Sequence, residues 1–300
     1  MNNNQLDEIK KIKNIKVLEN ESLKKYTSFK LDGKVAIVAY PENLDSLIKL
    51  LKYVREENIK YKIIGNGSNL VFICEKYNGV LIKLDFLDDL KINDTTIKVG
   101  AGYSLIKLAS KVSKEGLTGL EFASGIPGTV GGAVFMNAGA YKSDMGYIVS
   151  EVKVLTPKYE VKTLYNRDLN FHYRTSFLQK NPDYICLEAT IILKHGKKKD
   201  IEDLMEERKK RRIMTQPLEF PSAGSVFRNP EDDFAGRLIE SIGLKNKNIG
   251  DAYISDKHAN FIINKGNAKG MDVKNLIDEV KKQVKKEYGI ELKAEQEFVE

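Results

Sequence analysis

A glycine-rich segment from Ser124 to Gly139 carries the strongest chemical signal in this sequence. It reads Ser-Gly-Ile-Pro-Gly-Thr-Val-Gly-Gly-Ala-Val-Phe-Met-Asn-Ala-Gly and contains five glycines, one proline and no charged residue. Glycine lets a ligand or another backbone approach closely, but a run this dense costs conformational entropy on folding. Peptide N–H groups that bind a large anion such as a phosphate would compensate for that cost. A mobile surface loop is the alternative, although such loops are usually polar and this segment is apolar between its glycines.

A second glycine segment, Gly65-Asn66-Gly67-Ser68-Asn69, lies between two short apolar runs at 61–64 and 70–73. Strand, tight turn and strand form the pattern of a β-hairpin, so a structural hairpin and a ligand loop both remain open. Two such loops in one half of the chain suggest one extended ligand with two phosphates. The sequence has neither the P-loop motif of nucleoside triphosphatases nor the strand–Gly-x-Gly-x-x-Gly–helix unit of Rossmann dehydrogenases, which disfavours both classes.

Three polar residues have local surroundings that suit chemistry. Arg174 lies among aromatic and hydroxyl residues, with an ordinary surface arginine as the alternative. Ser225 lies among small residues between two prolines, which suits the wall of a pocket, but it lacks the Gly-x-Ser-x-Gly elbow of hydrolase nucleophiles. Glu295 lies in the tail, 290–299, which we expect to be a strand with Glu295 on the face opposite its apolar residues. On an exposed edge it would be an ordinary surface glutamate.

Apolar periodicity predicts a first region of mixed helices and strands up to about residue 195. Helices are expected at about 42–58 and 105–115, and strands at 61–64, 70–73, 79–84, 96–99, 152–155, 161–164 and 185–193. The strands at 152–155 and 161–164 are expected to form a hairpin. Because strands and helices do not alternate regularly, the region does not fit a βαβ array.

A change of composition at 196–200 predicts a second domain, which begins with a highly charged helix. Pro230 is expected to open a later helix at its first position, with Phe234 on the buried side. A strand at 259–263 and a final helix that ends at Gly289 precede the tail.

Length and composition bound the class of protein. The 300 residues, 42% hydrophobic and 30% charged, are typical of a globular protein of two or three domains. The net charge of +7 would help to collect an anionic substrate. The lysines alternate with acidic residues and no aromatic-basic platform occurs, so we expect no nucleic-acid partner.

The remaining signals concern metals and membranes. Cys74 and Cys186 lie in apolar runs and are expected to be small buried residues, and the three histidines are scattered, so no metal site is expected. The sequence shows no signal peptide and no apolar run long enough to cross a bilayer, so we expect no membrane insertion and a cytoplasmic location.

Taken in order, the motifs resemble those of the UDP-N-acetylenolpyruvoylglucosamine reductase family, which completes UDP-N-acetylmuramate in bacterial peptidoglycan synthesis. The resemblance covers nearly the whole chain from about Tyr26. The short path from Arg174 to Ser225 is similar to that of compact members, which lack an inserted tyrosine loop over the substrate. The motifs are Gly65-Asn66-Gly67-Ser68-Asn69, Ile126-Pro127-Gly128-Thr129-Val130-Gly131-Gly132-Ala133 continued by Asn137-Ala138-Gly139, Tyr173-Arg174-x-Ser176, Gly224-Ser225-Val226-Phe227-x-Asn229-Pro230, and Lys257-His258-Ala259-x-Phe261.

The resemblance implies an α+β fold. An FAD-binding domain of the vanillyl-alcohol-oxidase (PCMH) type would form two lobes, 1–85 and 86–198. A C-terminal α+β substrate-binding domain would follow at 199–300, with the terminal strand 290–300 returning to the active site. We favour a monomer, and the sequence leaves the oligomeric state open.

The resemblance also implies an activity: NADPH-dependent, FAD-mediated reduction of UDP-N-acetylglucosamine enolpyruvate to UDP-N-acetylmuramate, a step in cell wall biogenesis that serves cell shape and division. Arg174 would stabilise negative charge that develops beside the substrate carboxylate. Ser225 would donate the proton that completes the reduction. Glu295 would act if it is protonated or if it orients another group.

Binding residues follow from the same resemblance. Tyr173 would pack on the nucleotide sugar, Arg212 would contact the substrate, and Asn229 would bind the sugar or a phosphate. The residues expected to bind FAD are Gly65, Asn66, Gly67, Ser68, Asn69, Gly125, Ile126, Pro127, Gly128, Thr129, Gly131, Gly132, Asn137, Ala138 and Gly139.

The tail departs from the family pattern. Ala294 replaces a frequent proline, Glu297 stands where many relatives have arginine, and the chain ends Phe-Val-Glu instead of Ile-Ile-Gly. Two alternatives therefore stay open: another FAD oxidoreductase of the same superfamily, such as a sugar-alcohol oxidase, and a non-enzymatic binder of anionic ligands.

Overall fold

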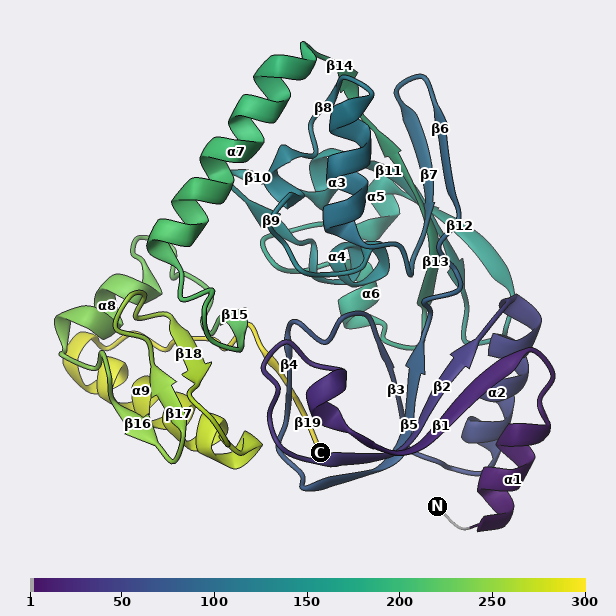
Figure 1. The fold of residues 1–300 in the computed structure, drawn as a ribbon, viewed down its shortest axis with the longest axis horizontal. Coiled ribbons are helices and arrows are strands. Elements are labelled where there is room, and N and C mark those ends of the chain that lie inside the picture. Colours follow the sequence, from purple (N-terminus) through teal and green to yellow (C-terminus); the bar gives the residue numbers. More distant parts are fainter. Residues whose placement is uncertain (1–2) are drawn as a thin grey trace. The chain divides into compact units, whose positions relative to one another are not determined.

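In the computed structural model, which describes residues 3–300, the chain divides into two units built from alternating stretches of sequence. Unit 1 comprises the chain up to Val17, Val38–Asn66 and Leu81–Lys210, and unit 2 comprises Leu18–Ile37, Gly67–Val80 and Arg211–Glu300. The predicted three-part division into 1–85, 86–198 and 199–300 stays a prediction. The unit boundaries fall inside three strands of a sheet of order β1-β2-β5-β3, namely β1 (Ile15–Ser22), β2 (Lys34–Pro41) and β5 (Lys76–Lys83); the fourth is β3 (Tyr61–Ile64) (Figure 1).

A five-stranded antiparallel sheet of order β12-β11-β13-β7-β6 forms the centre of unit 1. Its strands alternate buried apolar and exposed residues, as in Ile97 and Val99 on either side of Lys98. The predicted hairpin is confirmed, with Val152 opposite Leu164. The strands are β6 (Leu90–Asn93), β7 (Thr96–Gly100), β11 (Val149–Leu155), β12 (Val161–Tyr165) and β13 (Ile185–Ile192).

The two long helices predicted in unit 1 are confirmed. Helix α2 (Leu44–Glu56) begins with a capping box between Asn43 and Ser46, and α3 (Leu105–Lys114) ends before Gly116, whose φ of 71° suits a residue that leaves a helix. The sequence did not predict helix α1 (Asn3–Lys11). The charged helix α7 (Lys198–Thr215) crosses the unit boundary. The remaining short elements are β8 (Leu117–Thr118), α4 (Val130–Met136), β9 (Gly139–Ala140), β10 (Ser143–Asp144), α5 (Asn166–Leu169), α6 (Phe177–Lys180) and β14 (Lys194–His195), with 3₁₀ turns at Glu121–Ala123 and Met145–Tyr147 in unit 1 and at Leu23–Lys25 in unit 2.

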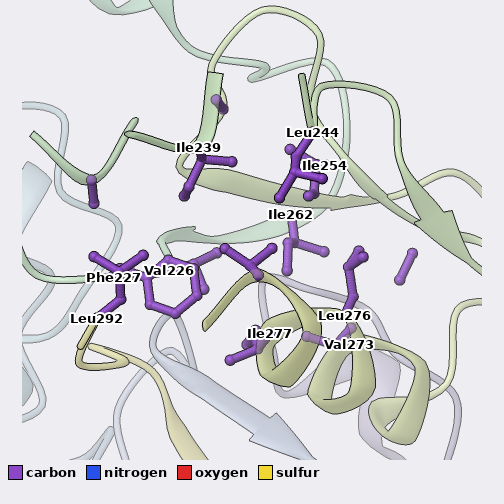
Figure 2. Packing of buried hydrophobic residues seen from close by; sticks show 14 of the residues in the cluster. Val226, Phe227, Ile239, Leu244, Ile254, Ile262, Val273, Leu276, Ile277 and Leu292 are labelled. Carbon is purple, nitrogen blue, oxygen red and sulfur yellow. The ribbon is translucent and has the colours of Figure 1, made fainter. Parts of the chain in front are cut away.

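One hydrophobic core organises unit 2. Figure 2 shows side chains of α9 (Gly270–Tyr288), including Val273 and Ile277, packed beneath a four-stranded antiparallel sheet. The final helix ends at Gly289 with φ of 70°, as predicted. The sheet, of order β15-β18-β17-β16, contains β15 (Ser222–Ser225), β16 (Asn248–Ile249), β17 (Ala252–Ile254) and β18 (Phe261–Asn264); α8 (Ala235–Ser241) and the parallel pair β4 (Leu70–Phe72) and β19 (Glu297–Val299) complete the unit.

The glycine segment 65–69 does not join a hairpin. Strand β3 joins the β1-β2-β5-β3 sheet, whereas β4 pairs in parallel with β19, so the segment leads the chain from one sheet to another. Gly67 takes a φ of 60°, and a Cβ there would lie 2.1 Å from the carbonyl oxygen of Tyr26. The hairpin interpretation was wrong because β3 pairs with β5, the next strand but one, and β4 pairs with β19 at the far end of the sequence.

Two other expectations were also wrong. Pro230 precedes a turn, and helix α8 begins at Ala235, whose amide donates to the side chain of Asn229. Phe234, expected on a buried side, is 67% exposed because it precedes the helix. The tail is a strand only at 297–299, because Glu295 and its neighbours pair with a different segment, as described below.

The cysteine and membrane expectations can also be compared with the structure. Cys186 is buried in β13, as predicted, but Cys74 is half-buried in a bend after β4. None of the helices within residues 3–300 combines the length and apolar character that a membrane crossing needs.

Candidate active site

The two glycine segments meet within unit 1. A Cβ on Gly65 would lie 2.4 Å from Oγ1 of Thr129, so only glycine fits against that hydroxyl. Thr129 is the N-cap of α4, and its Oγ1 accepts a hydrogen bond from the Gly132 amide at 3.3 Å. The two loops that the sequence indicated for one ligand therefore touch each other.

The glycines of the second segment differ in what they face. A Cβ on Gly131 would lie 2.9 Å from the Cβ of Ala101, and one on Gly139 would lie 2.4 Å from the carbonyl oxygen of Ser143. These glycines allow close packing of protein against protein. Gly128, in contrast, has open space where a side chain would stand, so this part of the loop leaves room for a ligand.

Backbone amides show where an anion could bind. Within the described residues, the amides of Asn66, Gly67 and Ser68 in the first loop, and of Gly125 and Thr129 in the second, have no hydrogen-bond partner. Other amides of the second loop are engaged: that of Gly128 donates to Ile126 and that of Gly131 to Ala101, both at 2.8 Å. Within unit 1 the available donors among these are the amides of Asn66, Gly125 and Thr129, a smaller set than the glycine content suggested.

Arg174 occupies a tight turn of unit 1. His172 and Thr175 exchange two backbone hydrogen bonds of 3.0 Å, and Arg174 between them takes a left-handed φ of 52°, which costs energy in a residue with a side chain. Its Nη2 donates to the carbonyl oxygen of Gly139 at 2.8 Å, and its guanidinium lies 5.1 Å from the ring centre of Tyr173. The turn thus holds a permanent cation against the end of the second glycine segment.

Buried polar groups fix this turn from both sides. Asn137, which ends α4 at a left-handed φ of 44°, accepts from the Gly146 amide and donates its Nδ2 to the carbonyl of His172, both at 2.9 Å. Ser176, with no exposed surface, donates to the carbonyl of Phe135 at 2.7 Å. The sequence indicated Asn137 only as a cofactor residue; the contacts that show it supporting the Arg174 turn lie 35 residues apart and gave no local signal.

Ser225 ends strand β15 of unit 2. It pairs with Phe261 of β18, and an irregularity after Ser222 together with Gly224 at a φ of 72° turns the strand end. Val226 and Phe227, which follow, anchor this end in the hydrophobic core near Leu292 (Figure 2). The serine therefore stands on a backbone that is fixed by packing on its C-terminal side.

Asn260 is a supporting residue that the motif left unspecified. Its side chain forms two hydrogen bonds with the backbone of Phe227, accepting from the amide at 2.9 Å and donating to the carbonyl at 2.8 Å. Its amide donates to Nδ1 of His258 at 3.2 Å, and burial lowers the pKa of His258, which favours the neutral ring. The Lys257–Phe261 block thus positions the serine motif.

Glu295 lies beside the serine motif in unit 2. Its amide donates to the carbonyl of Val226 at 2.8 Å, and its carbonyl accepts from Nδ2 of Asn69 at 2.9 Å. Ala294 bridges to Phe227, and the next residue, Gln296, donates to the carbonyl of Ala223 at 3.3 Å. The tail therefore lies beside the serine motif, and Asn69 of the first glycine segment helps to hold it there.

The predicted substrate residues differ in their exposure. Tyr173 is 52% exposed in unit 1; in unit 2, Asn229 after the serine motif is exposed and Arg212 near the end of α7 is half-buried. In sum, unit 1 brings Arg174 to the second glycine loop, and unit 2 brings Ser225, Glu295 and Asn69 together.

Comparisons with known proteins show the family of this chain. A family model described as an FAD binding domain matches residues 35–165, and one described as the C-terminal domain of UDP-N-acetylenolpyruvoylglucosamine reductase matches residues 216–299. Proteins named UDP-N-acetylenolpyruvoylglucosamine reductase are 49% identical in Anoxybacillus flavithermus, over 94% of each chain, and 43% identical in Bacillus subtilis, over 98% of this chain and 97% of that one. The crystal structure of the Thermus caldophilus reductase matches with a TM-score of 0.79 and 33% identity, over 95% of this chain and 99% of that chain.

Proposed function

Because the chain belongs to the UDP-N-acetylenolpyruvoylglucosamine reductase family, we propose that Arg174, Ser225 and Glu295 carry out its reaction, with NADPH as electron donor. The reaction is the FAD-mediated reduction of the enolpyruvyl group of a UDP-sugar in peptidoglycan precursor synthesis. One observation supports this assignment of residues: the C-terminal segment lies beside the serine motif. The amide of Glu295 donates a hydrogen bond to the carbonyl of Val226, the residue after Ser225.

The glycine loops fit an extended dinucleotide with two phosphates. Their contact at Gly65 and Thr129 brings the available amides of Asn66 and Thr129 together within unit 1, and the space beside Gly128 admits a ligand. The amides of Asn66, Gly67, Ser68, Gly125 and Thr129 would hold the FAD diphosphate. When bound, FAD supplies the hydride chemistry, taking hydride from NADPH and passing it to the CH2 carbon of the enolpyruvyl group.

Arg174 would stabilise the negative charge that develops on the substrate. Hydride addition at the CH2 carbon leaves electron density on the neighbouring carbon, which bears the carboxylate. A guanidinium remains charged at any physiological pH, and a fixed cation costs no reorganisation when the charge appears. The contact of Arg174 with Gly139 and the buried supports of its turn provide that fixed position.

Ser225 would deliver the proton that completes the reduction. A serine hydroxyl is a weak acid, so it needs a neighbour that replaces its proton. Glu295 lies in the paired segment next to it and is the candidate for this role, either as a neutral carboxyl that donates or as a group that orients a water. Two backbone hydrogen bonds, from the Glu295 amide to Val226 and from Asn69 to the Glu295 carbonyl, fix the position of this residue beside the serine motif.

The substrate residues are assigned from the family resemblance. Tyr173 would stack on the nucleotide sugar, Asn229 would bind the sugar or a phosphate, and Arg212 would pair with a phosphate or carboxylate. We keep the monomer and the cytoplasm as the expected state and location.

One experiment tests this proposal. The purified protein is expected to be yellow, to bleach with NADPH in the absence of oxygen, and to recover its colour promptly when the enolpyruvyl UDP-sugar is added. UDP-N-acetylglucosamine, which lacks the double bond, is the matched control and should leave the flavin reduced. A colourless protein overturns the FAD assignment, bleaching by NADH but not by NADPH overturns the donor, and reoxidation by the control sugar overturns the substrate.

A further inference from the structure

Lys83 is a buried cation that the reaction described above does not use. The residue is 8% exposed, at the end of strand β5, after Val80, Leu81 and Ile82, which have no exposed surface. Its Nζ lies 2.8 Å from the carbonyl oxygen of Gly65 and 3.1 Å from Oδ1 of Asp85. The first glycine loop therefore has an ammonium group directly behind it, within unit 1.

This contact sets the direction of one peptide group. The carbonyl of Gly65 and the amide of Asn66 belong to the same planar trans peptide, so they point in opposite directions. Because Lys83 holds the carbonyl, the N–H of Asn66 is directed away from Lys83, and it has no partner within residues 3–300. Thr129 closes the other side of Gly65, which leaves this peptide little freedom to rotate.

A carbonyl oxygen alone does not require a charged partner. Taking an ammonium group out of water is costly unless other charges compensate for it, and a neutral donor would satisfy Gly65 at lower cost. The only carboxylate that pairs with Lys83 among the described residues is that of Asp85, whose side chain is 46% exposed and therefore screened by water. A bound anion in front of the loop would supply the remaining compensation.

We propose that Lys83 is a positioning residue for the diphosphate of FAD: it aims the Asn66 amide at a phosphate and adds a positive charge behind the loop. This proposal rests on the proposed function, since it requires FAD at the glycine loops. It concerns affinity for the cofactor, so its test does not depend on turnover.

The test measures FAD release from holoprotein by the fluorescence of the free flavin on dilution. Lys83→Met removes the charge and the donor at similar length, and Lys98→Met, on the exposed face of β7, is the matched control. Loss of a charge-assisted hydrogen bond is expected to raise the Kd for FAD in K83M by about 10-fold or more. K98M should match the wild type. The Kd of K83M should also depend less steeply on salt, because one cation no longer contributes; a purely structural role would not change that slope.

The outcomes separate the two levels of inference. A wild-type protein without FAD contradicts the proposed function, whereas a wild type with FAD and a K83M of equal Kd and equal salt dependence contradicts only the role of Lys83. If circular dichroism shows that K83M does not fold, Lys83→Arg and Lys83→Gln decide. We expect the arginine variant to retain FAD affinity within about 3-fold and the glutamine variant to lose about 10-fold, since only the first keeps the charge. A glutamine variant that binds as the wild type does would overturn the proposal.

Discussion

The two units hold their reactive groups in different ways. In unit 1, Arg174 stands on a strained turn that buried side chains support, and every support comes from residues 135–176. In unit 2, Ser225 and Glu295 stand on extended segments that pair through their backbones, and the partners come from residues 69, 226 and 295. The contacts that hold the Arg174 turn span up to 41 residues of sequence, whereas the proposed proton-donating pair is held by a contact that spans 226 residues, between Asn69 and Glu295.

This difference matches the roles proposed for the two groups. A charge stabiliser needs one fixed direction, which the buried hydrogen bonds and the strained backbone of the Arg174 turn provide. The proposed proton donor, Ser225, and its neighbour Glu295 lie on segments that are far apart in sequence and are brought together by backbone pairing, at a higher loop-closure cost. Substitutions at the Arg174 turn of unit 1 should therefore slow the step in which negative charge develops on the substrate. Substitutions at Ser225 or Glu295 of unit 2 should slow the delivery of the proton.

Ser225→Ala should give the largest effect, because it removes the group proposed to deliver the proton. The rate of flavin reoxidation by the enolpyruvyl substrate should fall by about 10³-fold, within the range typical of general acids, while reduction by NADPH stays unchanged. Stopped-flow absorbance of the flavin separates the two half-reactions. Ser222→Ala, in the same strand, is the matched control. An equal loss in both half-reactions would assign Ser225 to cofactor binding or folding instead.

Arg174→Met should give the next largest effect, since it removes the fixed cation and leaves an apolar side chain of similar length. The reoxidation rate should fall by about 10²-fold, and Arg174→Lys should recover only part of it because an ammonium lacks the planar fork. The measurement is again single-turnover reoxidation, now with substrate at saturation so that a change in KM is separated. Full activity in the lysine variant would show that charge alone, without the turn geometry, is sufficient.

Asn137 tests whether the turn itself matters. Asn137→Gly keeps the left-handed backbone but removes both amide hydrogen bonds, whereas Asn137→Ala also strains the backbone. The reoxidation rate should fall by about 10-fold in the glycine variant, at unchanged FAD content, with a further loss of about 1 kcal/mol in the free energy of unfolding for alanine relative to glycine. Lower FAD content with normal reoxidation would instead place Asn137 with the cofactor.

The same contrast explains what the sequence could predict. Arg174 and Ser176 lie two residues apart, so a local motif identified both. The long strands and helices were predicted because their apolar residues recur with the period of a strand or a helix. The partner of β4 lies at the far end of the sequence, and the local pattern of two short apolar runs around a glycine turn predicted a hairpin with β3 instead. Asn260 and Lys83 were missed because a buried polar residue is recognised by its distant partners, which no local pattern contains.

Pro230 shows a different limit. Its ring suits the first position of a helix, but the side chain of Asn229 accepts from the amide of Ala235, and this hydrogen bond closes a turn before the helix starts. A side-chain cap six residues away overrode the local preference. Phe234 was placed on the wrong side for the same reason.

The smallest expected effect concerns a thiol in the central sheet of unit 1. Burial, with a smaller contribution from Glu188, raises the pKa of Cys186 to about 12. In the unfolded chain a thiol has a pKa of about 8.5, so folding favours the neutral form and the stabilisation is complete below that value. As the pH rises toward 12, the free energy of unfolding should fall by about 1.4 kcal/mol per pH unit from this group.

Denaturant unfolding tests this prediction, and thiol labelling compares Cys186 of unit 1 with Cys74 of unit 2. Between pH 8.0 and 9.5, the wild type should lose roughly 1 kcal/mol more stability than Cys186→Ala, because alanine removes the titration and its cavity costs the same at both pH values. Cys74 is half-buried in unit 2, so native protein should react with a thiol reagent there first. Equal labelling rates for Cys186 and Cys74, with normal flavin reoxidation, would show that the sheet of unit 1 opens without disturbing the Arg174 turn. The turn, and not the sheet, would then be the rigid part of unit 1.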